Sequence, residues 1–206
     1  HSYFPFVMEM LYTLGLLVRS VAAAKLFHYL TACLLAATML AWGQRLGGRL
    51  VGLIAASVFL STPVVFSELG SGYVDLGLSC YALAALYALT RWREGAEGRW
   101  HLVAGIFAGV CLGIKYTGGV TLAFVLLAGA LHVVRSGRSL WTRWAVVGGV
   151  AVLVGGPWYL KNQLQTGNPV YPFLYERFGG VRWDQTRADA YSAEQHTYGT
   201  GRGLLD

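Results

Sequence analysis

The residues best suited to chemistry are a few charged side chains set in a strongly apolar sequence. Glu68 and Asp75 lie in a short segment that holds acids and no base. Seven residues apart, they would share one face of a helix, although Gly70 and Gly72 argue against an unbroken helix there. Such carboxylates can bind a metal, serve as a base or hold sugar hydroxyls. The alternative is structural, because Asp75 also stands where an N-cap would precede a helix over Leu76–Leu89.

Lys115 is the strongest single candidate for a functional residue, and its chemistry suggests phosphate binding. It ends an apolar run and is followed directly by Tyr116, Thr117, Gly118 and Gly119. A lysine ammonium is a compact cation with three donors, and backbone N–H groups at the start of a helix add affinity for anions. A lysine in this position can instead simply extend to water. The glycine-rich turn favours a phosphate site, in which we place Tyr116 beside Lys115.

A second lysine follows the last apolar run, in the segment Gly156–Asn162. Pro157 is expected to break the helix there, and Trp158 and Tyr159 suit the lipid headgroup region. Lys161 then becomes a further candidate for phosphate. An ordinary aromatic belt with an extended lysine explains the same residues.

Composition indicates the setting of these side chains. Of the 206 residues, 55% are hydrophobic and only 13% charged, and the mean hydropathy is +0.50. A water-soluble domain carries about a quarter charged residues. The net charge of +6 does not indicate a nucleic-acid partner, because the arginines lie in short loops between apolar segments. We therefore predict an all-α, polytopic transmembrane helical bundle.

Six apolar stretches of helical length follow one another along the chain. They are Ala22–Trp42, Leu50–Pro63 with an extension towards Phe66, Val74–Leu89, His101–Ile114, Gly119–Val134 and Trp144–Leu160. We expect about six spans from them, preceded by an interfacial helix within Ser2–Leu17. Residues 1–172 form the predicted transmembrane domain, and residues 173–206 a polar, partly ordered non-cytoplasmic tail.

The remaining small and polar residues of the apolar stretches are assigned to packing. Gly105, Gly109 and Gly113 repeat every four residues, which permits close contact with another helix. His28 and His132 have no second ligand at metal-binding spacing, and the three cysteines are scattered in apolar sequence. No metal site is predicted from spacing, and a divalent metal held by the carboxylates stays an open alternative.

The distribution of basic residues predicts the orientation. If Ala22–Trp42 runs from outside to inside, eight basic residues fall on one side of the membrane and, counted before the tail, four on the other. The first side receives Arg45, Arg49, Arg91, Arg93, Arg99, Arg135, Arg138 and Arg143, and the second Arg19, Lys25, Lys115 and Lys161. Since basic loops are cytoplasmic, the candidate residues and the tail are expected on the non-cytoplasmic face.

Several short stretches, in this order, resemble a known class of enzymes. They are Tyr3–Tyr12 (YFPFVMEMLY), Leu60–Pro63 (LSTP), Tyr73–Leu76 (YVDL), Gly113–Gly118 (GIKYTG), and Pro157–Asn162 (PWYLKN) with Gly167–Pro172 (GNPVYP). The chain resembles the polyprenyl-phosphate-sugar-dependent membrane glycosyltransferases of the GT-C class, in the protein O-mannosyltransferase / aminoarabinose transferase-like group. The resemblance covers nearly the whole chain. Each motif is short, and their order and spacing carry the likeness.

The resemblance implies an integral membrane enzyme, in the bacterial inner (plasma) membrane, surrounded by membrane lipids. Its donor would be a polyprenyl-phosphate sugar, and its acceptor a lipid, a protein or a glycan on the non-cytoplasmic face. Lys115 would hold the lipid phosphate, and Glu68 and Asp75 would face the active cavity. The family's catalytic base would lie in an outer loop before residue 1, so residues 1–206 alone are expected to insert without transferring sugar.

Three polar residues in the matching stretches complete the predicted site. Tyr3, Asn162 and Asn168 are expected to contact the sugar or the acceptor, or to have a structural role.

A non-catalytic transporter or lipid-handling scaffold is the alternative function. Acids and bases at helix breaks also suit transporters, which place them near the middle of the bilayer and are often built from repeats. In this sequence the charges cluster towards one interface and no repeat is evident, which favours the transferase.

Overall fold

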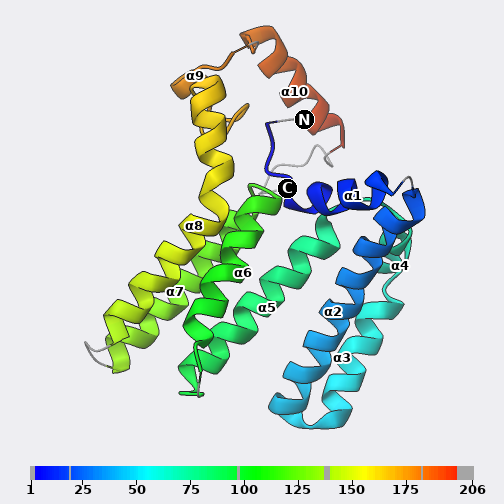
Figure 1. Cartoon of the computed structure of the whole chain (residues 1–206), viewed down its shortest axis with the longest axis vertical. Helices are drawn as coiled ribbons and strands as arrows, with labels where there is room; N and C mark the ends of the chain where they lie inside the picture. Colours follow the sequence, from blue (N-terminus) through cyan, green and yellow to red (C-terminus); the bar gives the residue numbers. More distant parts are fainter. Residues whose placement is uncertain (1–2, 19, 97, 137–139, 182, 199–206) are drawn as a thin grey trace. The chain divides into compact units, whose positions relative to one another are not determined.

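A computed structural model describes residues 3–18, 20–96, 98–136, 140–181 and 183–198, and within them the chain is helical with no strand. The helices are α1 (Val7–Leu17), α2 (Val21–Gly47), α3 (Arg49–Ser61), α4 (Pro63–Leu69), α5 (Asp75–Arg93), α6 (Trp100–Ile114), α7 (Gly118–Ser136), α8 (Trp141–Thr166), α9 (Tyr175–Phe178) and α10 (Gln185–Tyr198) (Figure 1). The predicted all-α helical bundle is confirmed. Arg19 and Arg138, two of the residues counted for orientation, lie outside the described residues.

The chain forms two compact units. The bundle unit is Pro5–Gly156, which holds α1 to α7 and the first part of α8. The terminal unit is His1–Phe4 with Pro157–Asp206, which holds the rest of α8 together with α9 and α10. This division falls earlier in the chain than residue 172, where the transmembrane domain is predicted to end, and that functional boundary stays a prediction.

Small residues let the helices of the bundle unit approach closely. A Cβ atom built on Gly105 would stand 2.7 Å from the carbonyl oxygen of Val147, and one on Gly109 would stand 2.7 Å from that of Ala151. The predicted role of the glycine stripe in close packing is confirmed for these two positions, which face α8. The core beside them is built from alanines and valines of α5 to α8, together with Leu89 and Trp92 of α5.

The number of helices able to span a membrane is lower than the predicted six. By length and composition, three described helices qualify, namely α2, α7 and α8, or four if α3 and α4, bent by 68° at their junction, count as one span. α6 has 15 residues, which at 1.5 Å per residue gives about 22 Å, short of a bilayer core of about 30 Å. α5 has 19 residues, but Asp75, Arg91 and Arg93 occupy its ends.

Pro157 does not end its helix, contrary to the prediction. α8 continues through it to Thr166 and has 26 residues. A proline inside a helix removes one backbone donor and bends the helix, but the hydrogen-bond ladder can resume beyond it. The division between the two units falls at this proline.

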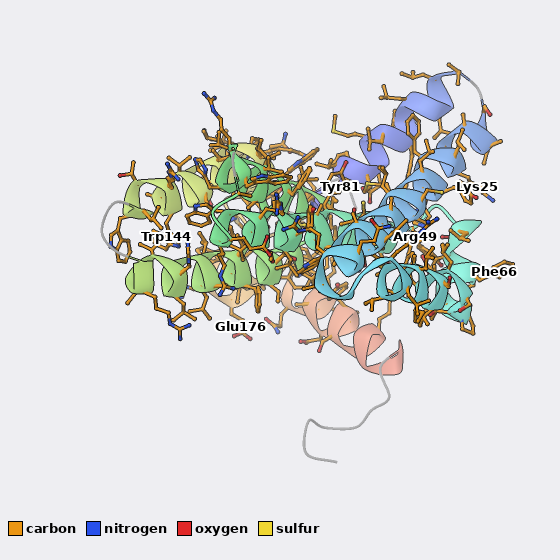
Figure 2. All side chains as sticks on the ribbon, turned by 90° about the horizontal axis from the view of Figure 1, so that it is seen from below. Lys25, Arg49, Phe66, Tyr81, Trp144 and Glu176 are labelled. Carbon is orange, nitrogen blue, oxygen red and sulfur yellow. The ribbon has the colours of Figure 1, made fainter. Side chains whose placement is uncertain are left out.

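Large apolar side chains cover the outside of the helices. Phe66 on α4 is 72% exposed and projects away from the helices in Figure 2, and Leu153 on α8 is 76% exposed. Many other leucines and valines are more than half exposed. A soluble protein rarely exposes such continuous apolar surface, whereas surrounding lipid accommodates it.

Candidate functional site

Asp75 and Lys115 form an ion pair at one end of the bundle unit. Lys115 Nζ donates to Asp75 Oδ1 over 3.0 Å. Asp75 is the first residue of α5, and Val74 occupies the N-cap position without a side-chain capping bond. The capping role considered for Asp75 therefore does not describe it. Two separate sequence candidates meet here, one acid and one base.

This ion pair is open to solvent and exchangeable. The lysine side chain is 47% exposed and the aspartate side chain 56% exposed. Exposed pairs contribute about 0–1 kcal/mol to stability, because water competes for both partners. An incoming anion can therefore replace Asp75 on Lys115 at little cost to the fold.

The turn between α6 and α7 fixes where Lys115 leaves its helix. Lys115 caps α6 with an extended backbone, φ −156° and ψ 149°, and its N–H donates to the Cys111 carbonyl. Its own carbonyl accepts from the Gly118 N–H over 2.8 Å. A Cβ atom on Gly118 would overlap the Cys111 carbonyl oxygen. Only glycine allows α7 to begin this close to the end of α6.

Glu68 lies at the end of α4 and is held by the loop that leads to Asp75. The Ser71 hydroxyl donates to the Glu68 carbonyl over 2.7 Å and lies 3.4 Å from Glu68 Oε2. The glutamate is half-buried. The two predicted carboxylates thus flank one short loop, with Glu68 the more enclosed of the two.

A buried hydrogen-bond network joins α1, α2 and this same loop. The Tyr12 hydroxyl donates to the Tyr73 carbonyl over 2.6 Å and lies 2.8 Å from His28 Nδ1. Because the hydroxyl has one proton and the carbonyl cannot donate, His28 must donate from Nδ1 to the Tyr12 oxygen. Sequence reasoning placed His28 in packing and did not single out Tyr12. Neither residue has a sequence signal that reveals its partner.

The phenol of Tyr12 stays protonated in this network. Burial raises the pKa of Tyr12 to about 12, and the negative charges of Glu9 and Glu68 add to the shift. Tyr12 therefore remains a neutral donor at physiological pH.

Helix α1 closes this end of the bundle unit. In Figure 1 it lies across the ends of α2 and α5. A Cβ atom on Gly77 of α5 would meet the Met8 sulfur at 2.7 Å, and one on Gly15 would meet the Ala24 backbone at 2.5 Å. Met8 and Tyr12 form one apolar cluster with Ile114, the residue before Lys115. The predicted N-terminal helix is thus part of the wall beside the ion pair.

Four of the other predicted site residues belong to the terminal unit, namely Tyr3, Lys161, Asn162 and Asn168. Lys161 Nζ lies 5.3 Å from the centroid of the Trp158 ring, a cation–π distance. Asn162 is buried and donates from Nδ2 to the Tyr3 carbonyl over 2.6 Å. Tyr116, in contrast, is half-buried in the turn after Lys115, in the bundle unit.

Asn168 has a structural role in the terminal unit. It is fully buried. Its Nδ2 donates to the carbonyls of Phe173 and Gly179 over 2.8 and 3.1 Å, and its Oδ1 accepts from the Val170 N–H over 3.0 Å. These bonds close the chain segment that carries α9. Among the two roles considered for Asn168, the structural one has direct support.

The charged groups do not gather as metal ligands. Within the part of the chain that the structure describes, no three His, Cys, Asp or Glu side chains converge on one point.

Comparison with known families decides the class of protein. The family model described as glycosyltransferase family 87 matches residues 2–196. The chain belongs to glycosyltransferase family 87. This is a GT-C-type family of membrane glycosyltransferases. No curated protein and no solved structure matches the chain significantly. The protein O-mannosyltransferase / aminoarabinose transferase-like assignment stays a prediction.

The family gives no role to individual residues. Lys115 and Asp75 meet at one end of the bundle unit, and Glu68 flanks the loop that leads to Asp75. The transporter considered from the sequence is not what the family indicates.

The network around Tyr12 predicts a loss of stability on removal of one hydroxyl. Tyr12→Phe leaves His28 Nδ1 and the Tyr73 carbonyl without this partner, and we expect a cost of about 1–3 kcal/mol. The readout is the thermal unfolding midpoint in detergent. Tyr29→Phe is the matched control, because Tyr29 is 48% exposed on α2. Equal midpoints for both variants would show that the network does not stabilise the fold.

Proposed function

We propose that this family 87 glycosyltransferase moves a sugar from a polyprenyl phosphate to an acceptor on the non-cytoplasmic face of the bacterial inner membrane. The observation that carries the proposal is the exchangeable Asp75–Lys115 pair, 3.0 Å long, directly beyond the apolar end of α6. A lipid phosphate at the interface needs a cation there, and Lys115 is such a cation.

The reaction gives Lys115 a stabilising role. The acceptor hydroxyl oxygen forms a bond to the anomeric carbon, the bond from that carbon to the phosphate oxygen breaks, and a base takes the hydroxyl proton. Negative charge therefore grows on the departing polyprenyl phosphate. A cation already held at that point stabilises the charge in the transition state. In the resting enzyme Lys115 is paired with Asp75, and the donor phosphate replaces Asp75 as the partner of Lys115.

Glu68 and Asp75 shape the site in this proposal without supplying the main base. In the full-length enzyme, we expect Glu68→Gln and Asp75→Asn to lower turnover while the protein still inserts in the membrane, because neither change removes an apolar contact. Turnover is measured against membrane-inserted protein quantified on immunoblots. Full turnover in both variants would reduce these carboxylates to solvated surface groups.

The donor class is tested by comparing a lipid-linked sugar donor with a soluble one. Membranes containing the enzyme are supplied either with a radiolabelled polyprenyl-phosphate sugar or with the matching nucleotide sugar, in the presence of an inhibitor of polyprenyl-phosphate-sugar synthesis. Transfer from the lipid donor alone supports the proposal. Transfer from the nucleotide sugar under these conditions would overturn it.

The proposed orientation is tested by labelling single cysteines. Ala96→Cys and Gly70→Cys are placed in a background in which Cys33, Cys80 and Cys111 are replaced. We expect an impermeant maleimide to label position 70 in intact cells and position 96 only after the membrane is opened, because the arginine-rich loops stay in the cytoplasm. Labelling of position 96 from outside would reverse the topology.

A further inference from the structure

The terminal unit contains a cavity that none of the predicted site residues explains. Its volume is about 310 Å³, which lies at the lower end of the range of about 300–1,000 Å³ typical of small-molecule sites. Its walls come from the segment around α9 and from the start of α10. The cavity lies wholly within one unit.

Aromatic rings form the apolar walls of this cavity. Phe173, Trp183 and Tyr191 line it. The Phe173 and Tyr191 rings are 5.9 Å apart at 73°, and the Trp183 and Tyr191 rings are 6.1 Å apart at 69°. These edge-to-face contacts set the rings at steep angles, so they form walls instead of one closed stack. Phe173 is 39% exposed, and the apolar surface is therefore accessible.

Polar groups of balanced charge share the same cavity. Glu176, Arg177 and Gln185 also line it, and Glu176, which is labelled in Figure 2, is exposed. Among the described residues Glu176 has no hydrogen-bond or ion-pair partner. Gln185 uses its Nε2 on Asp189 over 3.0 Å, which leaves its carbonyl oxygen as an acceptor. One carboxylate, one guanidinium and one amide together carry no net charge.

We infer that this cavity binds an uncharged sugar ring. A pyranose presents C–H groups on its faces, which match the negative faces of aromatic rings, and hydroxyls on its edge, which match carboxylate, guanidinium and amide groups. A phosphate would suffer repulsion from Glu176, and an alkyl chain would offer no hydrogen-bond partner to the carboxylate, the guanidinium and the amide. A neutral polyol with apolar faces can pack against the aromatic rings and hydrogen-bond to the polar side chains of the cavity.

The cavity is held in shape by contacts on its far side. Asn168 closes the segment that carries α9, and the Tyr171 hydroxyl donates to the Val181 carbonyl over 3.0 Å. Leu174, in the wall itself, has a left-handed backbone with φ 53°. Such a conformation is strained for a leucine and persists where the surroundings determine it. A preformed cavity loses little entropy on binding.

The bound sugar is assigned to the acceptor, and this assignment alone rests on the proposed function. Sugar binding itself needs no donor and no catalysis. It can therefore be measured separately from transfer.

The experiment is saturation-transfer difference NMR on the purified protein in detergent. The probes are methyl α-D-glucopyranoside, methyl α-D-mannopyranoside and methyl α-L-arabinofuranoside, with acyclic sorbitol as the comparison. We expect saturation of the ring C–H protons of at least one glycoside and none on sorbitol. Glu176→Gln should weaken that binding about tenfold, equivalent to about 1.4 kcal/mol, and Trp183→Phe should reduce it further.

The matched control is Glu194→Gln, an exposed acid on the same helix α10 that does not line the cavity. It should bind the glycoside as the unchanged protein does. Equal saturation of sorbitol and glycosides, or equal loss in Glu194→Gln and Glu176→Gln, would overturn the inference. Glycoside binding, combined with no transfer from a polyprenyl-phosphate sugar by the full-length enzyme, would refute the proposed function and leave the sugar site standing. Transfer by the full-length enzyme without glycoside binding would overturn the sugar site and leave the proposed function standing.

Discussion

In the full-length enzyme, Lys115→Ala is expected to reduce use of a polyprenyl-phosphate donor by about 10- to 150-fold. Hydrogen bonds to charged groups contribute about 1.5–3 kcal/mol, and each 1.4 kcal/mol is a factor of ten. Lys115→Arg should lose less, because it keeps the charge while changing the geometry of the donors. The measurement is initial rate against donor concentration, normalised to the amount of enzyme in the membrane.

The ion pair with Asp75 allows a test that separates phosphate binding by Lys115 from its pairing with Asp75. If Lys115 serves only to hold Asp75, exchange of the two residues, Asp75→Lys with Lys115→Asp, should restore what Lys115→Asp alone destroys. If Lys115 meets phosphate, the exchanged pair should stay inactive, because the cation now extends from α5. Recovery of donor use in the exchanged pair would remove Lys115 from the phosphate site.

The fold should tolerate all of these changes. Both side chains of the pair are about half exposed, and exposed pairs add at most about 1 kcal/mol to stability. The amount of inserted protein and its unfolding midpoint should therefore stay close to those of the unchanged enzyme. A loss of rate with normal insertion is the signature of a binding group.

Sequence reasoning reaches the helices and the main charges because both depend on local pattern. Apolar runs place α7 within two residues of both its observed ends, and they place the starts of α2 and α8 within three residues, although both helices continue beyond their predicted ends. The rarity of charge in apolar sequence singles out Asp75 and Lys115, although forty residues separate them. That they touch follows from helix packing, which brings the start of α5 to the end of α6.

The missed features are those fixed by contacts distant in the sequence. Tyr12 and His28 acquire their roles only because α1 lies across the end of the bundle unit. The α8 helix continues beyond Pro157 because a helix ladder can resume after one lost bond. The sugar cavity depends on Tyr191 meeting both Phe173 and Trp183. Aromatic residues spread through a polar tail do not predict that their rings will line one cavity.

Gly118→Ala is expected to have the second large effect, on folding and activity together. The added methyl group would overlap the Cys111 carbonyl oxygen. That oxygen belongs to backbone and cannot move aside as a flexible side chain can, so α7 must shift away from α6. Overpacking typically costs about 1–3 kcal/mol, and we expect the upper end of that range. Because the same turn sets the position of Lys115, donor use should fall beyond the loss of folded protein.

Gly119→Ala provides the matched control for this prediction. Its Cβ atom would meet only the Leu112 Cδ2 atom at 3.8 Å, an ordinary contact. Since alanine favours helix by about 0.5–1 kcal/mol over glycine, this variant should fold as well as the unchanged protein or better. Unfolding midpoints in detergent and donor-dependent rates are compared for the two neighbouring changes. If Gly118→Ala matches Gly119→Ala in both, the backbone contact at Cys111 yields without cost, and the position of Lys115 does not depend on the turn.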